Sequence, residues 1–90
     1  DATPHNFVLV KPNSIEEVGL AANNMAKDPI AAKSGQFIPK SNKIIVHTKM
    51  LKQGESEILR FNAPKKAGNY PFLCSFPGHW TIMKGNLTVK

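Results

Sequence analysis

Three side chains that bind soft metals lie within ten residues of one another near the end of the chain. Cys74, His79 and Met83 fall in the run YPFLCSFPGHWTIMKG, and a second imidazole, His5, lies far upstream. One thiolate, two imidazoles and a weak thioether make up the donor set that holds copper in electron-transfer sites. The spacing of the three downstream donors suits one loop between two strands. The residue types therefore predict a copper-binding loop.

The loop resembles the copper-binding loop of the azurin family of cupredoxins, and the resemblance extends over nearly all 90 residues. The segment Pro4-His5-Asn6-Phe7 resembles the part of that family that carries its first histidine ligand, and VHTKMLKQGESEILRF resembles its middle strands. The resemblance implies one azurin-like copper-binding domain over residues 1–90. Its implied fold is all-β, a cupredoxin-like Greek-key β-sandwich with one inserted helix.

The same resemblance assigns the metal ligands. It implies that His5, Cys74 and His79 are the three strong copper ligands and that Met83 is a long axial contact. Pro4 stands where the family often has a glycine whose carbonyl approaches the metal. Proline keeps that carbonyl but fixes φ near −65°. The weak contact between the Pro4 carbonyl and the metal is therefore only what the resemblance implies.

Residues beside the ligands receive roles in the same way. The resemblance implies that the backbone N–H groups of Asn6 and Phe76 donate hydrogen bonds to the cysteine sulfur. It also implies that the Asn6 side chain ties the two ligand segments together. His79 is expected to reach the surface as an electron port inside an apolar surround of Phe76, Pro77, Trp80 and Ile82. His47 has no second donor near it in the sequence and is predicted to be a partly exposed histidine that binds no metal.

These implications predict an electron-transfer protein, not an enzyme, whose mononuclear type 1 (blue) copper site cycles between Cu(I) and Cu(II). Two alternatives stay open. The chain could be the type 1 copper domain of a larger or two-chain redox enzyme, although its three histidines are too few for a second metal centre. It could also be a carrier module for copper or zinc without redox turnover. Zinc tolerates one cysteine and two histidines, but it leaves Met83 without a purpose.

Composition limits the partners. Twelve basic residues against six acidic ones give a net charge of +6. Scattered lysines of this kind either form an ordinary solvated face or attract an acidic redox protein or an anionic surface. The resemblance implies a c-type cytochrome or a copper oxidoreductase as partner and a periplasmic or otherwise extracytoplasmic location. Aromatic and basic residues are not interleaved, so nucleic-acid binding is not expected. A membrane span would need about 20 consecutive apolar residues, and the chain has no such run.

The pattern of apolar residues predicts the elements that position this loop. Ser14 and Glu17 form a capping pattern, and Ile15, Val18 and Ala22 continue as one apolar stripe, so we expect a helix over about residues 15–27. The Pro-, Gly- and Ser-rich stretch 28–43 is expected to be a loop. Apolar runs and alternation predict strands at 7–10, 44–46, 56–62, 70–74 and 86–90.

The chain departs from the family before its first ligand. Azurin-like domains have further strands there, whereas this chain starts four residues ahead of His5. A sheet that lacks its opening strands exposes edges that pair with another chain. Three explanations are open: a fragment of a longer protein, a sheet completed by a second chain or a second copy, and a deliberately shortened cupredoxin. We favour the first two, and hence a fold incomplete at the N-terminus.

Overall fold

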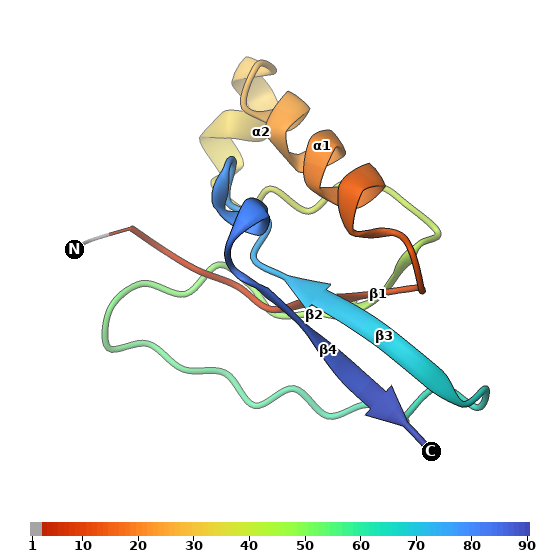
Figure 1. Cartoon of the computed structure of the whole chain (residues 1–90). Coiled ribbons are helices and arrows are strands. Elements are labelled where there is room, and N and C mark those ends of the chain that lie inside the picture. Colours follow the sequence, from red (N-terminus) through yellow and green to blue (C-terminus); the bar gives the residue numbers. More distant parts are fainter. Residues whose placement is uncertain (1–2) are drawn as a thin grey trace.

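One antiparallel sheet organises the chain. The structure, a computed structural model, describes residues 3–90. Along the chain it has β1 (Val8–Val10), α1 (Ile15–Met25), α2 (Pro29–Ser34), β2 (Ile44–His47), β3 (Gly68–Leu73), the 3₁₀ helix η1 (His79–Thr81) and β4 (Lys84–Val89). The strands lie in the order β2-β1-β3-β4, and Figure 1 shows both helices on the same side of them.

The short strand β1 is an inner strand of the sheet and lies between β2 and β3. It pairs with β2 through Val8 and His47, and with β3 through Val8 and Leu73. A bulge between Leu9 and Val10 shifts the register against β2. Because β3 and β4 pair along their whole length, from Gly68 with Val89 to Leu73 with Lys84, the two strands that flank the predicted metal-binding loop form one hairpin.

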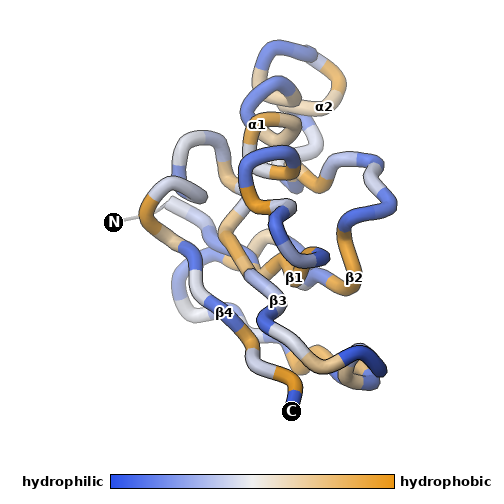
Figure 2. The backbone as a smooth tube through the Cα atoms, turned by 45° about the vertical axis from the view of Figure 1, so that its right-hand side comes forward, coloured by the Kyte–Doolittle hydropathy of each residue, from blue (hydrophilic) through white to orange (hydrophobic). Residues whose placement is uncertain are grey.

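The core lies between the sheet and the helices. Val8, Val10 and Leu73 pack against Val18 of α1, and all four side chains are buried. Val8 and Val10 are two residues apart in a strand and so point to the same face. Figure 2 shows the apolar stretches of β1 and β2 side by side. The pairing of buried Val8 with buried Leu73 places the segment before β1 and the segment after β3 at the same end of the sheet.

The helix predicted from the capping pattern is present, but its start is built differently. The Ser14 hydroxyl makes no capping bond to the helix and instead donates to the Pro12 carbonyl oxygen at 3.3 Å. The Val18 N–H still donates to the Ser14 carbonyl oxygen at 3.0 Å, as a first helical bond does. The helix ends at Met25 rather than near residue 27.

Two other predictions of secondary structure were wrong. Residues 29–34 form α2, which was expected to be loop: Pro29 occupies its first turn, the Asp28 carboxylate accepts the Ile30 N–H at 3.0 Å, and Gly35 ends it at φ 70°. Residues 56–62 form no strand, although their side chains alternate. Within residues 3–90 no neighbouring strand pairs with this segment, and Phe61 is 38% exposed. Among the described residues 3–90, no helix is long and apolar enough to cross a membrane.

The core makes a prediction about stability. Leu73 is 1% exposed, so Leu73→Ala should lower the free energy of unfolding by about 2–5 kcal/mol through lost burial and the cavity left behind. Leu20 lies on α1 and is 48% exposed, so Leu20→Ala is the matched control, with a change within about 0.5 kcal/mol. Urea unfolding followed by circular dichroism measures both. Equal losses in the two variants would contradict this placement of the core.

Candidate metal centre

Sheet topology brings the ends of three strands to one place. His5 lies just before β1, Cys74 directly follows β3, and Met83 directly precedes β4. Because β1 and β4 both run antiparallel to β3, the start of each lies beside the end of β3. The metal-binding residues predicted from the sequence therefore gather at a single end of the sheet.

Three of the predicted ligands meet there. Cys74 Sγ lies 3.9 Å from His5 Nδ1 and 3.8 Å from His79 Nδ1, and the three atoms all lie within 4.8 Å of one another. The two imidazole rings are 5.2 Å apart between centroids and inclined at 37°. Cys74 is buried, His79 is partly buried and His5 is exposed. The sulfur thus lies at the bottom of the site and the imidazoles lie toward its rim.

These separations fit one metal ion. Zinc, which takes the same cysteine and histidine ligands, binds thiolate sulfur at about 2.3 Å and imidazole nitrogen at about 2.0–2.1 Å. Two such bonds meeting at a trigonal angle would hold sulfur and nitrogen about 3.8 Å apart. The observed separations of 3.8 and 3.9 Å match that value. One thiolate and two imidazoles in a trigonal frame are the donor set of blue-copper sites.

Backbone pairing holds His5 in place although its side chain is exposed. The His5 N–H donates to the Leu51 carbonyl oxygen at 2.9 Å, and the Leu51 N–H donates back to His5 at 2.7 Å. Next along the chain, the Phe7 N–H donates to Thr48 Oγ1 at 3.0 Å. The first imidazole is therefore anchored to the segment that follows β2.

The side chain of Asn6 joins the segment of His5 to the segment of Cys74, as the resemblance implies. Its amide Nδ2 donates to Ser75 Oγ at 2.8 Å, and its Oδ1 accepts the Ser75 N–H, also at 2.8 Å. Ser75 is fully buried and lies beside Cys74. Sequence reasoning did not single out Ser75 or Thr48, because nothing local marks a partner more than forty residues away.

Hydrogen bonds inside the loop shape it around His79. The His79 N–H donates to the Phe76 carbonyl oxygen at 2.9 Å, across a turn in which Gly78 has φ 86°. The Met83 N–H donates to the His79 carbonyl oxygen at 2.8 Å, and the Cys74 N–H donates to that of Met83 at 2.9 Å. These bonds close the loop, so that Cys74 and Met83 lie side by side at its base.

Other predicted site residues lie around this group. Met83 is 37% exposed and borders, with Cys74, a cavity of about 270 Å³. Pro4 borders a different cavity, together with Phe76. The axial contact of Met83, the carbonyl contact of Pro4 and the N–H donation from Asn6 and Phe76 to the sulfur stay predictions.

His47 lies outside the donor group, as expected. It is exposed, and its Nδ1 lies 2.8 Å from the Thr48 carbonyl oxygen. The donor group that the described residues form consists of His5, Cys74 and His79.

The electrostatics favour the metal-binding form of one imidazole. Burial lowers the pKa of His79 below its ordinary value of 6.5, and the nearby His5 lowers it further because two positive rings repel each other. Metals bind the neutral imidazole. The folded chain thus keeps His79 in its ligating form down to a lower pH than an isolated histidine.

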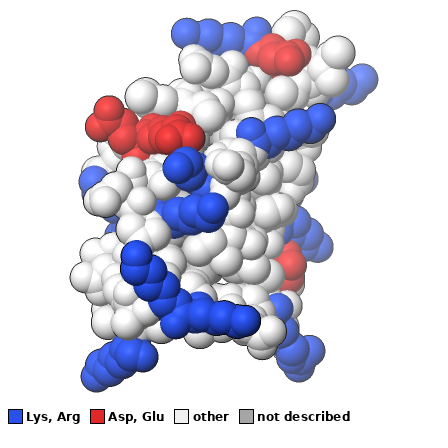
Figure 3. All heavy atoms as spheres, turned by 90° about the vertical axis from the view of Figure 1, so that its right-hand side faces the viewer, with Lys and Arg blue, Asp and Glu red and all other residues white. Residues whose placement is uncertain are grey.

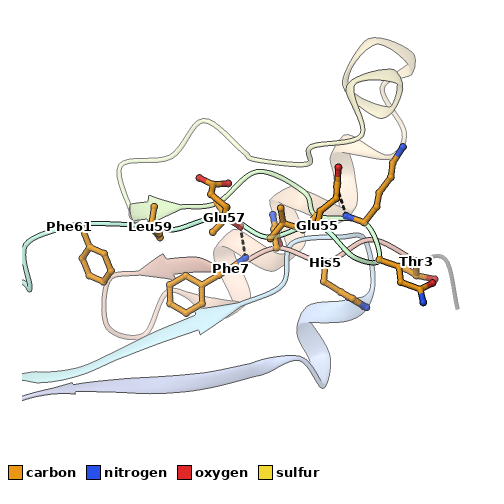
Figure 4. Close-up of a pocket in the computed structure, with 12 residues that line it drawn as sticks. Thr3, His5, Phe7, Glu55, Glu57, Leu59 and Phe61 are labelled. Atoms are coloured by element: carbon orange, nitrogen blue, oxygen red, sulfur yellow. Dashed lines mark hydrogen bonds between the residues drawn. The ribbon is translucent and has the colours of Figure 1, made fainter.

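A large open cavity lies beside His5. Its volume is about 690 Å³, and its walls include Phe7, Leu59 and Phe61 together with the carboxylates of Glu55 and Glu57. Figure 4 shows Phe7 and Phe61 toward one end of this space and His5 toward the other. His5 therefore lines this hollow at the end away from Phe7 and Phe61.

Comparison with known proteins agrees with this geometry. Residues 1–90 match the family described as copper binding proteins, plastocyanin/azurin family. The chain is 39% identical to Azurin-2 of Alcaligenes xylosoxydans xylosoxydans over 90 residues and 38% identical to azurin of Pseudomonas fluorescens biotype A. Each alignment covers 96% of this chain, and the chain spans 64% and 65% of the length of these two relatives.

Solved structures show the same fold. Reduced auracyanin from Roseiflexus castenholzii superposes with a TM-score of 0.77 at 40% identity, over 100% of this chain and 69% of that one. Auracyanin A, a "blue" copper protein from Chloroflexus aurantiacus, gives a TM-score of 0.77 at 30% identity, over 99% and 69%. The prediction of a mainly β, cupredoxin-like fold is confirmed. The chain belongs to the plastocyanin/azurin family of copper-binding proteins.

Proposed function

We propose that this chain is an electron-transfer protein that holds one copper ion between His5, Cys74 and His79, with Met83 as a weak axial contact. One observation carries the proposal: a cysteine sulfur and two imidazole nitrogens lie within 4.8 Å of one another in a chain of a copper-binding family. A copper ion in this donor set would accept and release single electrons. The function is that of a carrier rather than of an enzyme.

The chain's own contribution is to fix the donors in advance. His5 is anchored by its backbone pair with Leu51, and Cys74 by its N–H bond to the Met83 carbonyl. The two hydrogen bonds between Asn6 and Ser75 hold the two segments at one separation. Donors held in this way move little when the charge of the site changes, which lowers the reorganisation energy of electron transfer.

Smaller contacts would tune the site. We propose that the backbone N–H groups of Asn6 and Phe76 donate to the Cys74 sulfur and that the Pro4 carbonyl approaches the metal. Support comes from their positions, since Asn6 lies beside His5 and bonds to Ser75, and the Phe76 ring lies 4.7 Å from that of His79. Hydrogen bonds to a ligating sulfur withdraw charge from it and thereby shift the reduction potential.

The surface around His79 is the proposed port for electrons. His79 and Phe76 are partly exposed, and Ile82 is 83% exposed. A small apolar surface suits brief docking, because redox encounters use small interfaces. We propose a c-type cytochrome or a copper oxidoreductase as the partner, in a periplasmic or otherwise extracytoplasmic compartment.

Charge supports an acidic partner. The chain carries +6, and Figure 3 shows lysine and arginine side chains spread over one whole face with only a few acidic groups among them. Such a charge raises the rate of association with acidic proteins without fixing the docked position. The apolar port would fix that position.

A second chain, or a second copy of this one, remains our proposal for completing the sheet. The cavity beside His5 supports it, because Phe7, Leu59 and Phe61 line a hollow that another strand could fill (Figure 4). The unpaired segment 56–62 borders the same hollow and offers an edge for pairing.

The colour of the copper complex tests the function. Copper(II) added to the purified protein should give an intense visible band from thiolate-to-copper charge transfer, with narrow hyperfine splitting in electron paramagnetic resonance. Cys74→Ser removes the only thiolate and should abolish the band, whereas His47→Asn should leave it unchanged. A colourless complex would favour the carrier module, and unaided reduction of oxygen or nitrite would favour the enzyme domain.

The axial role of Met83 has its own test. Met83→Leu should keep the blue colour, because the three strong ligands remain. It should raise the reduction potential, because loss of the weak thioether donor disfavours Cu(II) more than Cu(I). Protein-film voltammetry measures the change, with Met25→Leu on α1 as the control. An unchanged potential in Met83→Leu would rule out the axial contact.

The lowered pKa of His79 predicts a pH dependence of the metal-free protein. Below pH 6.5 the unfolded chain binds a proton at this histidine more readily than the folded chain does, so stability should fall as the pH drops below 6.5. Proton NMR should show His79 titrating below 6.5. His5→Asn should raise its pKa only part of the way, because burial is the larger cause. Titration above 6.5 would contradict the placement of the two rings.

A further inference from the structure

Helix α1 touches the ligand loop from outside the metal site. Figure 1 shows the turn around residue 80 (blue) close to α1, and residues of η1 contact the helix. The contact centres on Asn23, a partly buried residue near the end of α1. Fifty-five residues separate Asn23 from the loop in sequence, so only the folded chain brings the two together.

The carboxamide oxygen of Asn23 accepts two hydrogen bonds from the loop. The Gly78 N–H donates to Asn23 Oδ1 at 2.8 Å, and the Trp80 indole N–H donates to the same oxygen at 3.3 Å. Gly78 and Trp80 are the residues immediately before and after His79. One oxygen on the helix therefore holds the ligand histidine from both sides along the chain.

Packing of the tryptophan ring reinforces these bonds. The Trp80 ring lies directly on Gly19, where a Cβ atom would come within 2.2 Å of the ring. Gly19 and Asn23 are four residues apart, so they lie on the same face of α1. Glycine weakens a helix interior relative to alanine. The close packing of the Trp80 indole against this position, which leaves no room for a Cβ atom, explains why the helix has a glycine here.

The loop's internal bonds do not replace this contact. The bonds from His79 to Phe76 and from Met83 to His79 shape the turn, but both their ends lie in the loop itself. On its other side, the Phe37 ring packs edge-on against Phe76 at 5.6 Å. Phe37 and α1 both belong to the segment between β1 and β2. That segment therefore brackets the loop and fixes it against the rest of the domain.

We propose that Asn23, with Trp80 seated on Gly19, is a positioning residue for His79: it fixes the ligand loop so that the imidazole already faces Cys74 before the metal binds. The proposal rests on the copper site proposed above. Asn23 reaches no metal-binding atom and acts only through Gly78 and Trp80. Partners that orient metal ligands typically change metal affinity by about 10–100-fold when they are removed.

Four variants separate this role from a merely structural one. Asn23→Leu keeps the approximate shape but removes the acceptor, and Asn23→Asp keeps an oxygen that can accept both bonds. Asn24→Leu makes the same change at the exposed neighbouring asparagine of α1. Gly19→Ala removes the seat of the indole by a second route.

The first measurement needs no copper. Trp80 is the only tryptophan, so the fluorescence of the metal-free protein reports on this indole when it is excited at the long-wavelength edge of tryptophan absorption, where Tyr70 does not absorb. Asn23→Leu and Gly19→Ala should shift the emission to longer wavelength and lower its anisotropy as the indole leaves the helix. Asn24→Leu should match the unmodified protein, and Asn23→Asp should stay close to it. Unchanged emission in Asn23→Leu would overturn the contact itself.

The second measurement is copper affinity, by competition with a chelator. Asn23→Leu should lose about tenfold or more and broaden the thiolate-to-copper band, whereas Asn23→Asp should recover most of the affinity. Equal losses in Asn23→Leu and Asn24→Leu, or no recovery in Asn23→Asp, would overturn the positioning role. A missing blue band in the unmodified protein would instead overturn the proposed function. The fluorescence of the metal-free protein would still show whether the contact exists.

Discussion

The antiparallel pairing of β1 with β3 is the constraint on which the site depends. Val8 pairs with Leu73, so the segment before β1 and the segment after β3 must leave the sheet at the same end. His5 and Cys74 are 69 residues apart in sequence, yet this register sets their donor atoms 3.9 Å apart. The bonds between Asn6 and Ser75 continue the same register two residues beyond the pair of Val8 and Leu73. A slip of one residue would turn every side chain of β1 to the opposite face and separate the donors.

Helix α1, in the long connection between β1 and β2, packs against the sheet and also contacts the ligand loop. Val18 of α1 closes the core over β1 and β3, and Gly19 and Asn23 meet the ligand loop. Packing that stabilises the fold and contacts that orient a ligand thus share one rigid element, which is where a precise site is best built. The loop can then be partly exposed, because its contacts with α1 fix its position.

Sequence reasoning reached the parts of the site that are local. The spacing of Cys74, His79 and Met83 predicts the ligand loop without any other information, whereas His5 was assigned through resemblance, because no local pattern marks its partner. Asn23 and Ser75 carry no signal at all, since their roles arise from contacts across more than fifty residues. The same reason explains segment 56–62: alternation predicts a strand, but a strand also needs a neighbour with which to pair.

The relation between the fold and the metal follows from these contacts. Many small metal sites form only when the metal draws unfolded ligands together. Here backbone pairs hold His5 to Leu51 and Cys74 to Met83, and a side-chain amide joins the two segments. These contacts between protein groups bring the two ligand segments together as the chain folds. A metal ion that binds the native state adds to its stability by mass action. In our proposal, the strength of metal binding depends on how firmly the loop bearing His79 is held, and α1 holds that loop through Asn23.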